Sequence, residues 1–105
     1  MELDSIVIVS LHTPKEKILG RLLSLTAVGV TMQGIDLNAF DDWVRQALEA
    51  KPNAVTLSTI FYPMQRLERS ALDEPSGEIP SLAQRFFGRV GVSLLDYLKL
   101  PRNSI

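Results

Sequence analysis

Three strand-like segments joined by short turns fill residues 5–36 and constrain the fold more than any other feature. Residues 5–11 are β-branched and apolar at both alternating positions, which predicts a strand that is covered on both faces. The polar segment 12–16 includes Pro14, which cannot lie in a central strand, so a turn is expected there. The chain is therefore expected to begin with a β-hairpin.

Residues 17–25 form the second expected strand, and Gly20 within it marks a bend or a close approach of another backbone. Apolar alternation resumes at Val28, so the next turn is expected at Thr26 and Ala27, with the third strand directly after it. The glycine inside the second strand favours a sheet that curls.

Helical spacing then replaces the two-residue period. The apolar residues at helical spacing are Phe40, Val44, Ala47 and Leu48. Asn38 is the expected N-cap, with Asp41 three residues on, and Asp41 and Asp42 complement the helix dipole in the first turn. A helix is therefore expected over residues 38–50, ending before Pro52.

Two further strands are expected on either side of Pro63. Residues 55–62 are rich in strand formers, and residues 64–72 alternate apolar with polar side chains. A proline between them predicts a sharp corner instead of a hairpin. The two strands are therefore expected either to belong to different sheets or to run beside different neighbours.

A loop over residues 73–78 separates this β part from a helical tail. Pro80 is expected at the first position of a helix that Gly88 or Gly91 ends, and Ser93 is expected to cap a second short helix directly after it. The apolar residues of the tail are Leu82, Phe86, Phe87, Val90, Leu94, Leu95, Tyr97 and Leu98. This set must be buried on the sheet, on a neighbouring subunit or on a partner.

Length and composition limit the class of protein. The 105 residues fit a single domain, in which residues 1–74 form the β part and residues 75–105 a helical extension. A net charge of −1 provides no overall field that would attract nucleic acid or an anionic membrane. The chain has no cysteine, which is compatible with a cytoplasmic protein. No segment approaches the ~20 apolar residues that cross a bilayer, so no membrane association is expected.

The stretch VIVSLHTPKEKILGRLLSLTAVGVTM combines a hydrophobic strand, a polar loop, the glycine at position 20 and an aliphatic alternation. The stretch IFYPMQRLERSAL adds a short corner and a final alternating strand. These stretches resemble the first and second motifs of the Sm and Sm-like family, which includes the Hfq-type RNA chaperones. The resemblance implies a mainly β (α+β) fold, a small, strongly bent five-stranded barrel, here with an inserted helix and a C-terminal helical hairpin.

The resemblance also implies a homo-oligomer, because the fourth and fifth strands of the family pair with neighbouring subunits to close a ring. Strand 55–62 of one copy would lie beside strand 64–72 of the next. Such pairing would also cover the edge strands of an open sheet. The residues expected at this subunit interface are Ile60, Tyr62, Leu67 and Arg69.

The same resemblance places any ligand or RNA site at Thr26, Tyr62, Gln65 and Arg66. The family uses an acid and an asparagine around the second turn, where this chain has residues 26–28, Thr-Ala-Val. The basic or glycine-bearing signature of the second motif is also replaced here. An RNA-binding Sm-like protein with an altered site is therefore the alternative interpretation.

Other candidate residues favour structural roles. His12 is the only histidine, and without cysteine it lacks an obvious zinc-binding set, so an exposed turn residue is expected. Asp36, Asp41 and Asp42 lie close in sequence but lack the calcium-loop spacing, so no metal or cofactor is expected. Trp43 lies off the main apolar stripe of its helix, where core packing is favoured over contact with a ligand or subunit.

The basic residues that could form a group are Arg66, Arg69, Arg85 and Arg89. Arg66, Glu68 and Arg69 alternate in sign, which favours a solvated or subunit-bridging strand over a phosphate track. No constellation supports enzymatic chemistry, although an enzyme or metal-dependent regulator using the acidic cluster is a third, more distant interpretation. The leading interpretation is a non-enzymatic assembly or binding module built on an oligomeric Sm-like barrel.

Overall fold

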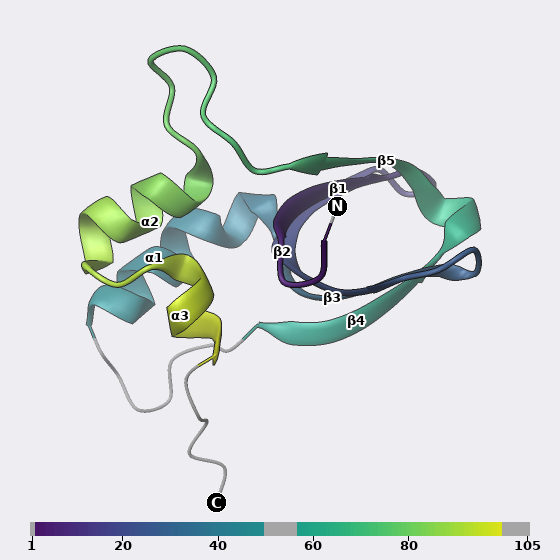
Figure 1. Cartoon of the computed structure of the whole chain (residues 1–105), viewed down its shortest axis with the longest axis horizontal. Coiled ribbons are helices and arrows are strands. Elements are labelled where there is room, and N and C mark those ends of the chain that lie inside the picture. The colour runs from purple at the N-terminus through teal and green to yellow at the C-terminus, as the bar shows by residue number, and fades with distance from the viewer. Residues whose placement is uncertain (1, 50–56, 100–105) are drawn as a thin grey trace, which may run out of the picture.

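The computed structural model describes residues 2–49 and 57–99, and in these residues it contains one sheet and three α-helices (Figure 1). In chain order the elements are β1 (Ile6–Leu11), β2 (Glu16–Leu25), β3 (Gly29–Asp36), the 3₁₀-helix η1 (Leu37–Ala39), α1 (Phe40–Leu48), β4 (Ser58–Pro63), the 3₁₀-helix η2 (Met64–Arg66), β5 (Leu67–Leu72), α2 (Leu82–Val90) and α3 (Leu94–Lys99). The helices gather beside the sheet at one end of the molecule.

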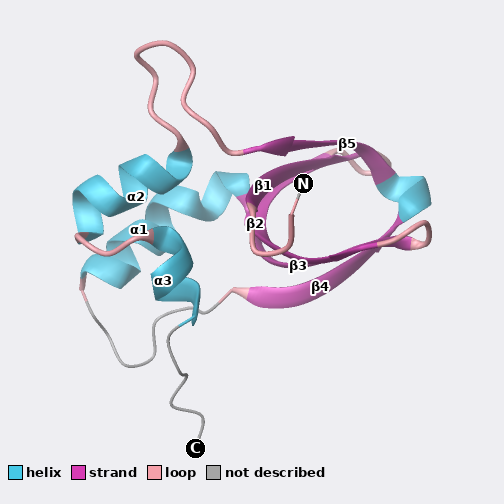
Figure 2. Cartoon of the chain, in the orientation of Figure 1, coloured by secondary structure: helices cyan, strands magenta, loops and turns pink. Residues whose placement is uncertain are grey.

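The five strands form one antiparallel sheet in the order β4-β3-β2-β1-β5 (Figure 2). The sheet curls strongly, but β4 and β5 do not pair with each other in the described residues, so these two edges remain open. The α+β class and the bent five-stranded sheet are thus as expected. The expected barrel is instead a curled sheet that is not closed.

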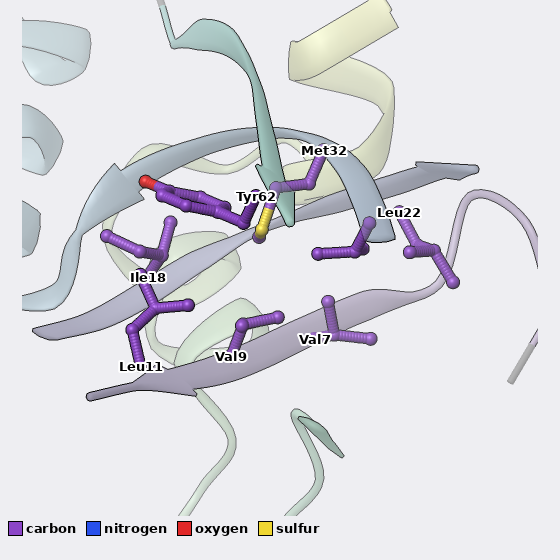
Figure 3. Close-up of a cluster of buried hydrophobic side chains, with 8 residues drawn as sticks. Val7, Val9, Leu11, Ile18, Leu22, Met32 and Tyr62 are labelled. Carbon is purple, nitrogen blue, oxygen red and sulfur yellow. The ribbon is translucent and has the colours of Figure 1, made fainter. Parts of the chain in front are cut away.

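Side chains fill both faces of this sheet. The inner cluster, on the concave face, consists of Val7, Val9, Leu11, Ile18, Leu22, Val30, Met32 and Tyr62 (Figure 3). The outer cluster joins the convex face to the helices and consists of Leu19, Phe40, Trp43, Val44, Ala47, Leu57, Phe86 and Leu94. β1 supplies Val7 and Val9 to the inner cluster, while Ile6 and Ile8 pack against the outer cluster. This confirms the strand covered on both faces.

Gly20 lies directly opposite Gly34 in the ladder between β2 and β3. A Cβ atom at position 20 would lie 2.2 Å from the carbonyl oxygen of Gln33, so a larger residue would push the strands apart. The register also shifts between Leu22 and Ser24, a bulge that increases the local bend. The expected close approach of a second backbone at Gly20 is confirmed.

The corner after Pro63 takes the chain from one edge of the sheet to the other through η2. β4 pairs with β3 and β5 pairs with β1, so the expected corner is confirmed, and of the two alternatives the strands have different neighbours within one sheet. The fifth strand begins at Leu67, not at Met64, because residues 64–66 form η2. The fourth strand begins at Ser58, and the expected start at residues 55–56 lies outside the described residues.

The boundaries around η1 also differ from the expectation. The third strand begins at Gly29, one residue later than predicted, because residues 26–28 form the turn. The side chain of Asp36 accepts a hydrogen bond from the Asn38 N–H at 2.8 Å, so Asp36 caps η1 and the predicted Asn38 cap is wrong. α1 follows η1, and the predicted last residue, Ala50, lies outside the described residues.

α2 begins at Leu82 with Ser81 as its N-cap, so the prediction of Pro80 at the first helical position is wrong. The Ser81 hydroxyl accepts a hydrogen bond from the Gln84 N–H at 3.0 Å, and the Gln84 side chain accepts one from the Ser81 N–H at 2.8 Å. α2 ends at Val90, and Gly91 follows with a φ of 86° in the left-handed region that glycine adopts readily, so of the two predicted glycines Gly91 and not Gly88 ends the helix. The Ser93 hydroxyl accepts a hydrogen bond in the first turn of α3, so the predicted cap is confirmed.

The tail helices bury apolar side chains against their own chain. Trp43 is 2% exposed and stacks on Phe86 with ring centroids 5.1 Å apart, and the Tyr97 ring meets Trp43 edge-on at 5.8 Å. Core packing of Trp43 is therefore confirmed. Among the alternatives for the tail, packing on its own sheet and α1 is the arrangement observed.

Residues 73–80 form an arm that projects from the molecule between β5 and α2 (Figure 1). The Asp73 N–H donates to the Ile6 carbonyl at 2.9 Å, and the Asp73 carboxylate accepts from the N–H groups of Leu82 and Ala83 at 2.8 Å each. Asp73 thus ties the end of β5 to the start of α2. The predicted loop over residues 73–78 is confirmed.

Candidate functional site

η2 lies at a corner where the turn between β1 and β2 meets the turn between β2 and β3. The His12 N–H donates to the Arg66 carbonyl at 3.0 Å, and the Met64 N–H donates to the Val28 carbonyl at 2.8 Å. η2 itself carries Gln65 and Arg66, two of the four residues expected at a ligand site. The fold therefore brings three connecting segments together at this corner.

Arg66 holds the turn between β1 and β2. Its Nε donates to the His12 carbonyl at 3.3 Å, and its Nη2 donates to the Pro14 carbonyl and to Glu16 Oε1, each at 2.9 Å. The guanidinium also lies over the Tyr62 ring, 6.0 Å from its centroid. Because its guanidinium already contacts these groups and holds the corner together, Arg66 is a weak candidate for binding phosphate.

Tyr62 points into the inner cluster, where its ring lies near Ile18 and Met32 (Figure 3). Burial raises the pKa of its hydroxyl above the ordinary value of 10.0. The negative charge of Glu16 raises this pKa further, whereas Arg66 acts in the opposite direction. Tyr62 is therefore a core residue, and its buried ring is poorly placed to stack on a ligand.

Thr26 lies in the turn between β2 and β3 and Gln65 lies in η2, on either side of the Met64–Val28 hydrogen bond. The Thr26 hydroxyl accepts from the Val28 N–H at 3.2 Å, and the Thr26 N–H donates to the Gly29 carbonyl at 3.0 Å. Thr26 therefore stabilises its own turn. Gln65 is exposed. The structure brings Tyr62 and Arg66 into contact and leaves Thr26 and Gln65 exposed.

The residues expected at a subunit interface lie on the two edge strands. Ile60 and Leu67 are partly buried against the inner cluster, and Tyr62 belongs to it. Arg69 is exposed on β5. Three of these four side chains therefore contribute to the core as well as lying on an edge strand.

Sequence reasoning missed Phe61. Its side chain is 50% exposed on β4, and its ring covers Gly29, where a Cβ atom would lie 2.7 Å from a ring carbon. Because Ile60 and Tyr62 point to the concave face, alternation places Phe61 on the convex face. That alternation in the sequence could have identified Phe61 as an outward aromatic residue.

The predicted acidic cluster is dispersed over separate structural roles. Asp36 caps η1, Asp41 accepts a hydrogen bond from Arg85 at 3.2 Å, and Asp42 forms an ion pair with Arg45 on α1. Across residues 2–49 and 57–99, no group of three histidine, aspartate or glutamate side chains is placed to hold a metal ion. These carboxylates therefore cap a 3₁₀-helix or pair with arginine side chains at the surface.

His12 and Arg89 are both exposed, His12 in the first turn and Arg89 near the end of α2. The Nδ1 atom of His12 lies 3.2 Å from the hydroxyl of its neighbour Thr13. The interpretation of His12 as a turn residue in solvent is confirmed. Arg66 lies in η2, Arg69 lies on β5, and Arg85 and Arg89 both lie on α2. Carboxylates pair with Arg66 and Arg85.

A pocket of about 260 Å³ lies beside the turn between β1 and β2. Its charged lining residues are Lys15, Glu16, Lys17, Asp36 and Glu68. Small-molecule sites are usually larger, about 300–1,000 Å³, and predominantly apolar. Charges of both signs around so small a pocket specify no ligand class.

Comparison of the chain with known protein families, curated proteins and solved structures finds no match. Within the described part of the chain, none of the helices has the length and apolar character needed to span a membrane. The features that can indicate a function are therefore the corner at η2 and the two open edges of the sheet.

Proposed function

We propose that the chain is a non-enzymatic assembly or binding module with an Sm-like fold, which forms a homo-oligomer through the edges of its sheet. The observation that carries this proposal is the strand order β4-β3-β2-β1-β5. The resemblance in sequence implies that the fourth strand of one subunit pairs with the fifth strand of the next. In this chain those two strands are the opposite edges of one curled sheet.

Edge strands present backbone N–H and C=O groups that can pair with another chain. A contact between β4 of one copy and β5 of another is heterologous, because two different surfaces meet. Each copy then offers one edge of each kind, so repetition produces a closed ring if the rotation allows it. Ring closure would leave every edge paired.

Size-exclusion chromatography with multi-angle light scattering tests this proposal over a range of micromolar concentrations. The expected mass is a whole multiple of the mass of one chain and stays constant on dilution. A monomer throughout this range would contradict the proposal.

RNA binding at the corner is a second candidate function. The Met64–Val28 hydrogen bond brings the second turn and the strand corner, the two segments that the resemblance associates with RNA, next to each other beside exposed Gln65. Labelled oligo-U and oligo-A at low and moderate salt test this candidate, with Gln65→Ala as the variant. Affinity that falls with salt and with this substitution supports RNA binding, and absence of binding at low salt removes it.

A further inference from the structure

The arm between β5 and α2 presents an exposed apolar side chain on a turn that is already formed. The Ser76 N–H donates to the Ile79 carbonyl and the Ile79 N–H donates to the Ser76 carbonyl, each at 2.9 Å. Gly77, with a φ of 60°, is the first central residue of this turn, where a type II′ turn requires a positive φ. Ile79 is 71% exposed. The arm therefore offers Ile79 in a defined geometry, which lowers the ordering cost of binding.

The arm is also acidic. Its residues include Asp73, Glu74 and Glu78 and no lysine or arginine. The Asp73 carboxylate accepts hydrogen bonds from the start of α2, whereas Glu74 and Glu78 are exposed. An apolar side chain accompanied by carboxylates is complementary to an apolar surface that carries positive charge.

The corner at η2 offers such an apolar surface. Val28 is 71% exposed, and Leu25, Phe61 and Met64 are exposed as well. The hydrogen bond from the Met64 N–H to the Val28 carbonyl holds η2 against the turn, and the Phe61 ring covers Gly29 beside it. Exposed apolar side chains that gather in this way are typical of a binding surface.

The charge of the corner is opposite to that of the arm. The two turns, residues 12–15 and 26–28, and η2, residues 64–66, contain no aspartate or glutamate. Lys15 is exposed in the first of these turns. Glu16, which follows it, pairs with Arg66, so the positive charge of Lys15 adds to a neutral pair. The corner therefore attracts an acidic partner.

We infer that the arm of one copy docks on the corner of a second copy. Ile79 packs against Val28 and Met64, and the Glu78 carboxylate approaches Lys15. The arm cannot reach its own corner, because the six residues of β5, about 20 Å long, separate the two. The arm also projects on the side of the helices, whereas the corner lies at the other end of the sheet (Figure 1).

This contact goes beyond the proposed assembly, because it uses neither open edge of the sheet. Stable interfaces bury about 1,200–2,000 Å² in total, which is more than one anchoring side chain and its neighbours provide. We therefore expect a transient contact between copies, which a covalent trap can detect and which does not by itself produce a stable dimer.

Disulfide trapping tests the contact cleanly, because the chain has no cysteine of its own. The Ile79→Cys variant is mixed with Val28→Cys and, as the matched control, with Phe87→Cys, which replaces an exposed apolar residue on α2. One chain of each mixture carries an isotopic label, so that mass spectrometry distinguishes mixed from self-linked dimers after oxidation. Circular dichroism before oxidation verifies that each variant is folded.

The mixed dimer of Ile79→Cys with Val28→Cys should form several-fold faster than the mixed dimer with Phe87→Cys. Adding Glu78→Lys to the Ile79→Cys chain should lower this ratio by up to about five-fold, the effect of an exposed ion pair, and Lys15→Glu in the partner should restore it. Because the ratio is taken against the Phe87→Cys mixture, a change in thiol reactivity cancels.

Equal rates in the two mixtures would overturn the contact, and faster trapping of Phe87→Cys would overturn the corner as its docking site. Light scattering on the parent protein separates this inference from the edge assembly. A monomeric parent whose variants give the expected mixed dimer removes the edge assembly alone, and an oligomeric parent whose variants do not give it removes the docking of the arm alone.

Discussion

At the scale of single residues, Gly20 and Gly88 provide a matched pair of opposite expectations. A Cβ atom at Gly20 would lie 2.2 Å from the Gln33 carbonyl oxygen, whereas one at Gly88 meets nothing within 4 Å. Gly20→Ala should lower the free energy of unfolding by about 1–3 kcal/mol through overpacking. Gly88→Ala, inside α2, should raise it by about 0.5–1 kcal/mol. Urea denaturation measures both values, and an unchanged Gly20→Ala variant would contradict the close approach of β2 and β3.

Tyr62 gives a pH dependence with a defined sign. Burial raises its folded pKa above 10.0, so the hydroxyl loses its proton more readily in the unfolded chain. The contribution of Tyr62 to the free energy of unfolding is fully present below the pKa that its hydroxyl has in the unfolded chain. It is lost as the pH rises through the higher pKa that the hydroxyl has in the folded protein. Between about pH 9 and about pH 11, the free energy of unfolding should fall more steeply for the parent protein than for Tyr62→Phe. Equal slopes in urea denaturation at these pH values would contradict a buried Tyr62.

Sequence and structure agree best at residues whose neighbours are close along the chain. Gly20 and Ser93 have the roles that local pattern predicts, because a glycine inside a strand and a serine before a helix act through backbone geometry. Arg66 was expected on an alternating strand and lies in η2, and its contacts were not predicted, because its partners lie at the turn between β1 and β2 and are distant in sequence. Such long-range contacts leave no periodic signal.

At the scale of elements, the aromatic contact between α1 and α2 determines how the helices pack beside the sheet. Phe86 is fully buried against Trp43, whereas its neighbour Phe87 is 57% exposed. Phe86→Ala should lower the free energy of unfolding by about 3–5 kcal/mol, since it leaves a cavity in the outer cluster. Phe87→Ala should change it by no more than about 0.5 kcal/mol. Fluorescence of Trp43 during denaturation measures the free energy of unfolding of both variants. Equal losses of stability would contradict the observation that α2 buries Phe86 and exposes Phe87.

Asp73 links two elements that sequence patterns treat as separate. Its carboxylate accepts hydrogen bonds from both Leu82 and Ala83 at the start of α2. Asp73→Ala should therefore cost about 1 kcal/mol of stability, as loss of a helix cap does. Glu74→Ala, at an exposed neighbouring position, is the control and should be nearly neutral. If thermal denaturation gives the same result for both variants, the cap does not stabilise the fold.

Element boundaries were predicted least well where short 3₁₀-helices occur. η1 and η2 were read as part of a helix and of a strand, because three residues are too few to show a period. The strands β1 and β2 were predicted within one residue, since each is rich in apolar residues and is bounded by a turn. The pattern therefore identified the elements, while caps such as Asp36 determined their ends.

At the scale of the whole molecule, the order of the strands in the sheet follows from the turns between them. Short turns make β1, β2 and β3 neighbours, and the corner at Pro63 carries β5 to the far side of β1. The sequence predicted that β4 and β5 belong to different sheets or have different neighbours in one sheet. It did not reveal that both would be open edges, because that depends on how far the sheet curls.

The central claim is that these edges join copies of the chain. Thr59→Pro tests it directly, because proline removes an N–H that faces the open edge of β4 and not one that bonds to β3. Light scattering should give an oligomer for the parent protein and a monomer for Thr59→Pro, with the same circular dichroism spectrum. A folded Thr59→Pro variant that keeps the parent's oligomeric mass would contradict assembly through this edge, as would a monomeric parent.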